Sequence, residues 1–153
     1  MSFKKIAVAL SVVGLALVSA RVDGQVGKSL GVVDANLASE ADLLKMPHMT
    51  APIVKGLISA RNFGSIVDLN KYLLGAGLTQ PQAMEFYNNA FIHVNLNTAT
   101  REEILLIPGA GNRMTREFPE YRPWKTFAQF DKEISKYVGQ KETDRLWRFV
   151  VIQ

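Results

Sequence analysis

Apolar side chains recur at helical spacing in the second half of the chain, in short runs separated by glycine and proline. Thr100 and Glu103 form the pattern of an N-terminal capping box, which predicts a helix that starts there and stops at Pro108-Gly109. Similar runs predict three more short helices, over residues 112–121, 127–135 and 142–148. Pro119 falls inside the first of these three and is expected to kink or shorten it.

The first half of the chain carries the same pattern. Its runs predict helices over residues 39–46, 51–61, 66–74 and 80–90. When the halves are shifted by 61 residues they align without a gap, and seven positions are identical: Val33, Asn36, Ala38, Leu44, Pro47, Arg61 and Lys71 match Val94, Asn97, Ala99, Leu105, Pro108, Arg122 and Lys132. These positions are turns, caps and core sites, which favours an internal duplication. We therefore predict an all-α fold of two tandem units, residues 33–93 and 94–153.

The first twenty residues differ from the rest. Two lysines, Lys4 and Lys5, precede an apolar run from Ile6 to Val18, and small residues follow up to Ala20. This order predicts a secretory signal peptide over residues 1–20 with cleavage after Ala20, and hence export across the inner membrane to the periplasm. Retention as a membrane anchor is the alternative, but the run is shorter than the roughly 20 residues that span a bilayer.

The composition narrows the chemistry. The chain has no cysteine, which excludes disulfides, thiolate zinc sites and cysteine nucleophiles. The net charge of +4 falls to +2 once Lys4 and Lys5 leave with the signal peptide, so charge alone does not indicate a nucleic-acid binder. Charge is uneven, however: residues 33–93 carry 4 basic and 5 acidic side chains, whereas residues 94–153 carry 10 and 8. Residues 21–32 are rich in glycine and are expected to be a flexible lead-in.

An ordered string of short motifs in the second half resembles a known module. The string consists of Val94–Thr100, Glu103-Ile104, Ile107–Gly111, Glu120–Arg122 and Pro123–Phe127. It resembles the ComEA-type tandem helix-hairpin-helix family over residues 94–131, with residues 33–71 as a degenerate copy. It is also similar to the module of the extrinsic PsbU subunit of photosystem II, which is secreted and acts in protein assembly. The resemblance implies the fold more directly than the function.

The resemblance implies a phosphate site at the second hairpin. Glycine adopts backbone angles that other residues avoid. Because it has no side chain, its backbone N–H group, together with those at the start of the next helix, can donate hydrogen bonds to a phosphate. The expected nucleic-acid-binding residues are Gly109, Ala110, Gly111, Asn112, Arg113 and Arg116. The alternative is that Gly109 and Gly111 only allow two helices to pack closely.

Other features argue against DNA binding. The first hairpin, Met46–Thr50, has no glycine, and no basic residue follows it until Lys55. Glu117 and Glu120 share the predicted helix with Arg113 and are expected to offset part of its charge. Two functions therefore stay open: a periplasmic protein that binds duplex DNA without sequence preference, and a secreted interaction or assembly subunit of a membrane-associated complex.

The remaining candidate residues are expected to have structural rather than catalytic or metal-binding roles, apart from Trp124. No serine lies in the frame of a hydrolase nucleophile, and His48 and His93 have no converging partners that would form a metal site. We expect no catalysis, cofactor or small-molecule substrate. Arg61 and Arg122 recur in both halves and are expected to be structural. Phe127 and Phe130 are expected in the core. Trp124 follows Pro123 on a connection, so it is the candidate for contact with a protein partner.

Overall fold

The computed structural model describes residues 25–26 and 31–153. The predicted signal peptide over residues 1–20 lies outside the described residues, as does most of the predicted lead-in over residues 21–32. Of that lead-in, Gln25–Val26 form a short strand, β1. The rest of the described chain is mainly helical, with only short strands, in agreement with the all-α prediction.

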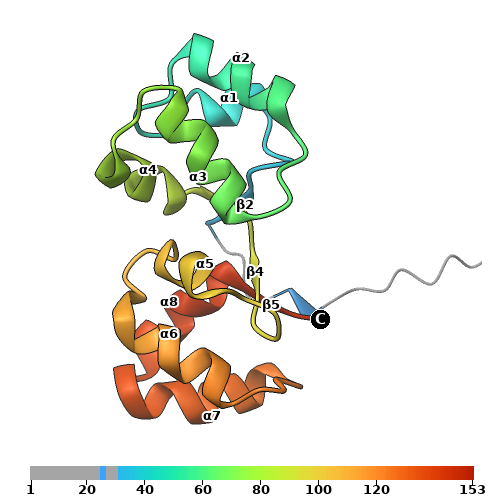
Figure 1. The fold of residues 1–153 in the computed structure, drawn as a ribbon, viewed down its shortest axis with the longest axis vertical. Helices are drawn as coiled ribbons and strands as arrows, with labels where there is room; N and C mark the ends of the chain where they lie inside the picture. The colour runs from blue at the N-terminus through green and yellow to red at the C-terminus, as the bar shows by residue number, and fades with distance from the viewer. Residues whose placement is uncertain (1–24, 27–30) are drawn as a thin grey trace, which may run out of the picture.

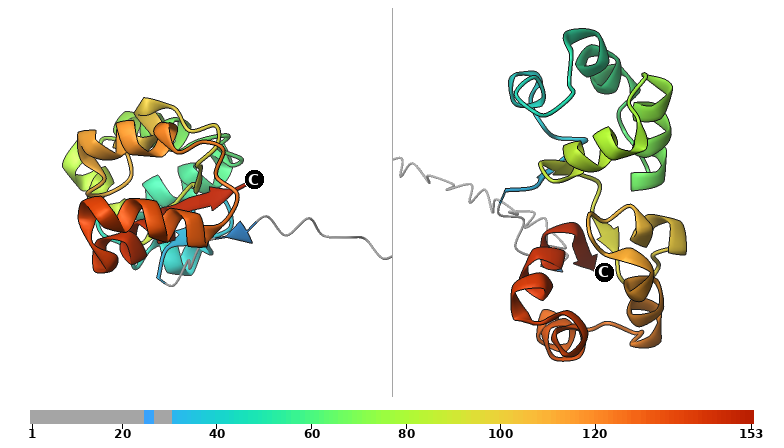
Figure 2. Two further views of the ribbon diagram at one scale, coloured as in Figure 1. Left: turned by 90° about the horizontal axis from the view of Figure 1, so that it is seen from below. Right: turned by 90° about the vertical axis from the view of Figure 1, so that its left-hand side faces the viewer.

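The described helices form two groups that lie end to end (Figure 1, and Figure 2, right). We call residues 33–93 the first lobe and residues 94–153 the second lobe. The first lobe contains β2 (Val33–Asp34), α1 (Glu40–Leu43), α2 (Ala51–Ala60), α3 (Ile66–Gly75), α4 (Gln80–Tyr87) and β3 (Ala90–Phe91). The second lobe contains β4 (Val94–Asn95), α5 (Arg101–Leu105), α6 (Gly111–Glu120), α7 (Phe127–Val138), α8 (Gln140–Leu146), a 3-10 turn η1 (Trp147–Phe149) and β5 (Val150–Ile152). The order of elements is thus the same in both lobes, apart from η1.

Hydroxyl side chains fix where most of these helices begin. In five helices the N-cap oxygen accepts a hydrogen bond from the amide three residues later, and the N-caps are Ser39, Ser65, Thr79, Thr100 and Thr126. The capping box predicted for Thr100 and Glu103 is present, because the Glu103 carboxylate also accepts from the Thr100 amide at 2.7 Å. Pro119 lies inside α6, one residue before its end.

Short strands are the main departure from the sequence-based prediction. The helix predicted over residues 80–90 ends at Tyr87, because Ala90–Phe91 pair in parallel with β2. In the second lobe β5 pairs in parallel with β4, and its other edge pairs with β1. Each lobe is therefore closed by pairing the strand at its start with the strand at its end. Strands of two or three residues leave no alternating apolar pattern from which they could be predicted.

Equivalent polar side chains make equivalent bonds in the two lobes. The Arg61 guanidinium donates to the carbonyl oxygens of Ala35 (3.1 Å) and Ala38 (2.5 Å). Sixty-one residues later, Arg122 donates to the carbonyl oxygens of Leu96 and Ala99, both at 2.7 Å. The structural role expected for both arginines is thus confirmed, and each ties the end of its lobe's second helix to the segment before the first.

A pair of asparagines repeats the same relation. Asn36 receives a hydrogen bond from the Phe63 amide (2.9 Å) and donates one to the Phe63 carbonyl (3.0 Å). Asn97 makes the same two bonds with Trp124, at 2.7 and 3.0 Å. The two peptide bonds that follow Arg61 and Arg122 are both cis.

One apolar core runs through both lobes. Phe91 of the first lobe and Phe149 of the second are buried and pack edge to face, with ring centroids 5.2 Å apart. The helices α3 and α5 also contact each other across the boundary. Within residues 25–26 and 31–153, none of the helices combines the length and the apolar character that a membrane crossing requires.

Candidate nucleic-acid interface

The second hairpin, residues 107–111, contains two glycines in the left-handed region. Gly109 has φ +76° and Gly111 has φ +62°, while Ala110 between them is right-handed helical. A Cβ atom added to Gly109 would stand 2.7 Å from a terminal nitrogen of Arg145, whereas a Cβ on Gly111 would meet nothing within 4 Å. The backbone conformation at position 109 and the close approach of Arg145 from α8 therefore both favour a glycine there. Gly111 serves the backbone alone and leaves the apex of the hairpin open.

The start of α6 is accessible. Its N-cap, Ala110, has no side chain able to bond the first amides, so these amides lack the usual capping partner. Gly111, Asn112 and Arg113, which form the first turn, are all exposed. An uncapped helix N-terminus combines free N–H donors with the positive end of the helix dipole, which favours an anion.

Arginine side chains surround this turn. Arg113 is exposed and donates to the Tyr137 carbonyl at the end of α7 (3.0 Å), which ties the second hairpin to the turn before α8. Arg116 is also exposed and makes no ion pair within the described part of the chain. Of the residues predicted to form the site, Ala110 is buried, whereas the other five are exposed: Gly109, Gly111, Asn112, Arg113 and Arg116.

Arg101 is a site residue that the sequence analysis missed. Its guanidinium, from the first residue of α5, donates to the Asn112 side chain and to the Thr115 hydroxyl, both at 2.9 Å. It therefore adds a third positive charge beside the first turn of α6. The alignment of the two halves contained a signal for it, because Glu40 occupies the equivalent position and the charge is reversed.

Of the two acids expected to offset part of this charge, Glu120 is exposed on α6 and Glu117 is not. Glu117 is only 7% exposed and lies against Tyr137, so it is not on the open face with Arg113. A hydrogen bond with Tyr121, burial and the Glu117 carboxylate together raise the pKa of Tyr137. Glu142 is paired with Arg145 through bonds of 2.8 and 2.5 Å, and this arginine lowers the pKa of Glu142.

The first hairpin, residues 46–50, shares one left-handed position with the second hairpin but differs at the other, where Thr50 is extended (φ −99°), and it has a different surface. His48 occupies the place of Gly109 and adopts φ +63°, although it is not a glycine. Its Nε2 atom lies 2.6 Å from the Glu85 carboxylate on α4, so a side-chain pair covers this hairpin. Pro52 stands in the first turn of α2, where it removes one backbone donor. The first basic residue is Lys55, so this helix start is poorly equipped to hold an anion.

Trp124 is part of the core. Its side chain is 2% exposed, and its indole N–H donates to the Phe118 carbonyl at 2.8 Å. Phe130, with its ring centroid 5.5 Å away, packs beside it and is buried, as expected. A residue covered in this way offers no surface to a protein partner, so the contact role expected for Trp124 is not supported. Phe127, which was expected in the core, is partly buried and packs against it.

The two histidines lie in different parts of the chain. His48 belongs to the first hairpin, and His93 lies between β3 and β4. Within the described residues no group of three or more histidine, aspartate or glutamate side chains is placed to hold a metal ion.

Comparisons of the chain with protein-family models, with curated proteins and with solved structures gave no match.

Proposed function

We propose that this chain is a secreted tandem helix-hairpin-helix protein that binds the backbone of duplex DNA without sequence preference. The binding surface is the second hairpin with the first turns of α6. One observation carries the proposal: an open hairpin with two left-handed glycines leads into an uncapped helix that is flanked by Arg101, Arg113 and Arg116.

The family part of the proposal rests on the duplication. The two lobes have the same order of helices, and their arginine and asparagine bonds recur 61 residues apart. Such agreement in side-chain contacts supports a common ancestor for the halves, and the motif string over residues 94–131 supports the helix-hairpin-helix assignment.

The proposed contact is electrostatic. A phosphate accepts from the amides of the first turn of α6, and the guanidinium groups of Arg113 and Arg116 complete its neutralisation. These contacts carry no sequence information, because they reach only the backbone. Each phosphate contact adds about 0.9 to the slope of log affinity against log salt. With one hairpin engaged, we expect the binding to be weak. The logarithm of the affinity should fall by about 2 to 3 for each unit increase in the logarithm of the salt concentration.

A fluorescence-anisotropy titration with a random-sequence duplex at low salt tests the proposal. The double variant Gly111→Asp with Arg113→Glu places two negative charges at the proposed phosphate position, and we expect it to abolish measurable binding. Wild-type protein that does not bind, or a double variant that binds as well as wild type, would contradict the proposal. Circular dichroism of both proteins checks that the fold is retained.

The duplication supplies a matched control. Arg116 and Lys55 occupy equivalent exposed positions on α6 and α2. Arg116→Glu and Lys55→Glu make the same change in net charge, so a general charge effect would weaken DNA binding equally. Of these two variants, we expect only Arg116→Glu to weaken DNA binding, by about tenfold, and to reduce the salt slope by about 1. Equal effects of the two variants would contradict a site at the second hairpin.

The competing function is that of an assembly subunit of a membrane-associated complex. The covered first hairpin favours it, because half of the molecule then has no phosphate site. This function predicts a stoichiometric partner when the tagged protein is purified from solubilised membranes, and no salt-sensitive retention on DNA. The absence of such a partner would remove this candidate.

A further inference from the structure

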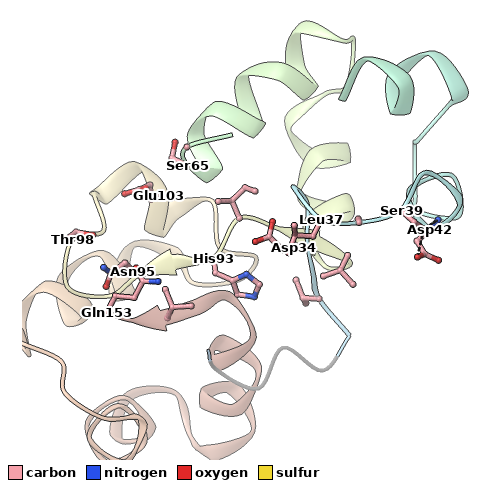
Figure 3. Close-up of a pocket in the computed structure, with 16 residues that line it drawn as sticks. Asp34, Leu37, Ser39, Asp42, Ser65, His93, Asn95, Thr98, Glu103 and Gln153 are labelled. Atoms are coloured by element: carbon pink, nitrogen blue, oxygen red, sulfur yellow. Dashed lines mark hydrogen bonds between the residues drawn. The ribbon is translucent and has the colours of Figure 1, made fainter. Parts of the chain in front are cut away.

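A cleft of about 930 Å³ lies where the two lobes meet (Figure 3). Its walls come from both lobes: β2 and the residues before α1 on one side, and β4, α5 and the end of β5 on the other. It does not include the second hairpin or any residue of α6. Whatever occupies this cleft is therefore a different ligand from the one that the hairpin would bind.

Apolar side chains in the cleft are unusually accessible. Leu37 is 82% exposed and Val33 is 42% exposed, and both line the cleft, as do the buried Ile92 and Val151. Single exposed apolar residues are common on protein surfaces. Here they stand together in a concave site, which is the arrangement that binding sites favour.

The charge of the cleft has one sign. Asp34, Asp42 and Glu103 line it, and none of the described residues that line it is lysine or arginine. Asp42 pairs with Lys45 at the rim, but Asp34 and Glu103 have no ion pair within the described part of the chain. Such a site attracts cations and repels phosphates.

His93 adds a buried nitrogen with an unused hydrogen-bonding position. The residue lies in the cleft between Asp34 and Asn95, and its Nε2 atom is buried and makes no hydrogen bond to any of the described residues. Burial lowers the pKa of the His93 imidazole, while the nearby Asp34 carboxylate acts in the opposite direction. A buried nitrogen of this kind is commonly satisfied by a ligand or a water molecule.

Two short edge strands border the cleft. β2 has β3 as its only neighbour among the described strands, and β4 stands at the edge of its sheet. Residues of both strands, Val33 and Asp34 from β2 and Asn95 from β4, line the cleft. The carbonyl oxygens of Asp34 and Asn95 each accept two amide hydrogen bonds from the turn that follows, so the backbone of these edges is largely satisfied and a ligand would be held mainly by side chains.

We propose that the cleft between the lobes binds a peptide segment of a protein partner that carries basic and apolar side chains. The apolar side chains pack on Leu37 and Val33, and the basic side chains pair with Asp34 and Glu103. The charge of the cleft selects this peptide over nucleic acid. The inference goes beyond the DNA-binding function and does not depend on it.

The duplication provides variants that keep the fold. Asn95 and Thr98 of the second lobe occupy the places that Asp34 and Leu37 occupy in the first. Asp34→Asn and Leu37→Thr therefore import residues that this backbone already accepts. The side-chain oxygen of the introduced asparagine can also accept the bond that the Asp34 carboxylate now takes from the Asn36 amide at 2.8 Å. Leu105→Thr is the control, because Leu105 is 39% exposed but lies outside the cleft.

The test uses a short fluorescent peptide in which lysine and leucine alternate, titrated with the full mature chain. A peptide of the same length that alternates glutamate and leucine measures nonspecific apolar binding. We expect the lysine peptide to bind and the glutamate peptide not to bind. Asp34→Asn with Leu37→Thr should weaken the lysine peptide about tenfold or more, and Leu105→Thr should leave its affinity unchanged.

Several outcomes would overturn the proposal. These are no binding of the lysine peptide, equal binding of both peptides, or an affinity that the cleft variants do not alter. Sedimentation velocity provides a further check, since a dimer that Leu37→Thr dissociates would mean that a second copy of the chain fills the cleft instead. The DNA titration is independent, so failure of either experiment leaves the other interpretable.

Discussion

In the first lobe His48 occupies the left-handed position of the hairpin and contacts Glu85 on α4, whereas in the second lobe Gly109 stands there and Arg145 fills the space beside it. The two hairpins share a left-handed φ at this position, +63° and +76°, but two residues later Thr50 is extended (φ −99°) where Gly111 is left-handed (φ +62°). They differ in what the turn offers to a ligand. The comparison indicates that the capacity to hold an anion depends on the left-handed glycine at the start of the second helix as well as on a few side chains around it.

The largest effects are expected in the core, at the equivalent positions Phe63 and Trp124. Replacing a buried aromatic residue by alanine costs about 3–5 kcal/mol. Trp124→Ala also leaves the Phe118 carbonyl without its indole donor, a loss that adds about 1 kcal/mol. Urea denaturation followed by circular dichroism should therefore rank Trp124→Ala above Phe63→Ala. The reverse order would mean that the first lobe limits the stability of the chain.

The next prediction concerns what the lobes share. Arg61→Ala and Arg122→Ala each remove a guanidinium that bonds two backbone carbonyls, and we expect each to destabilise the protein by about 2–3 kcal/mol. Lysine should not restore the stability at either position, because an ammonium group lacks the planar fork that spans both oxygens. Unfolding midpoints in urea provide the measurement. A large effect in one lobe and none in the other would contradict an equivalent role.

Local signals in the sequence were sufficient for much of this architecture. The helices, the capping box at Thr100 and the recurrence of Arg61 and Arg122 all follow from neighbouring residues or from the alignment of the halves. These features depend on hydrogen bonds and spacing within a few residues, or on a side chain repeated in both copies.

The parts that were missed depend on contacts between distant segments. The strands that close each lobe pair residues 56 or 57 positions apart, and no pattern of two or three residues predicts them. The burial of Glu117 and Trp124 depends on how α7 packs against α6, and Arg101 reaches Asn112 only after the hairpin has formed. The cleft between the lobes likewise exists only once both lobes are placed.

The two glycines of the second hairpin allow a finer test. Both adopt a left-handed φ, which costs an alanine about 1 kcal/mol. Gly109→Ala would also displace Arg145 from its bonds with Glu142, so we expect a loss of about 2 kcal/mol, against about 1 kcal/mol for Gly111→Ala. Thermal and urea unfolding of both variants measure the difference. If the two losses are equal, the close approach of Arg145 does not contribute to stability.

The smallest expected effect comes from transferring the second hairpin into the first lobe. His48→Gly, Thr50→Gly and Pro52→Arg reproduce the residues at positions 109, 111 and 113, in a helix that already carries Lys55 in place of Arg116. We expect DNA affinity at low salt to rise only a few-fold, with a salt slope steeper by about 1, because the exposed Glu85 carboxylate still stands beside the transferred turn. The single variant Pro52→Arg separates charge from backbone. If it matches the triple variant, the left-handed glycines do not contribute to anion binding. If the triple variant alone gains affinity, the difference between the two hairpins lies in the open turn as well as in the added arginine.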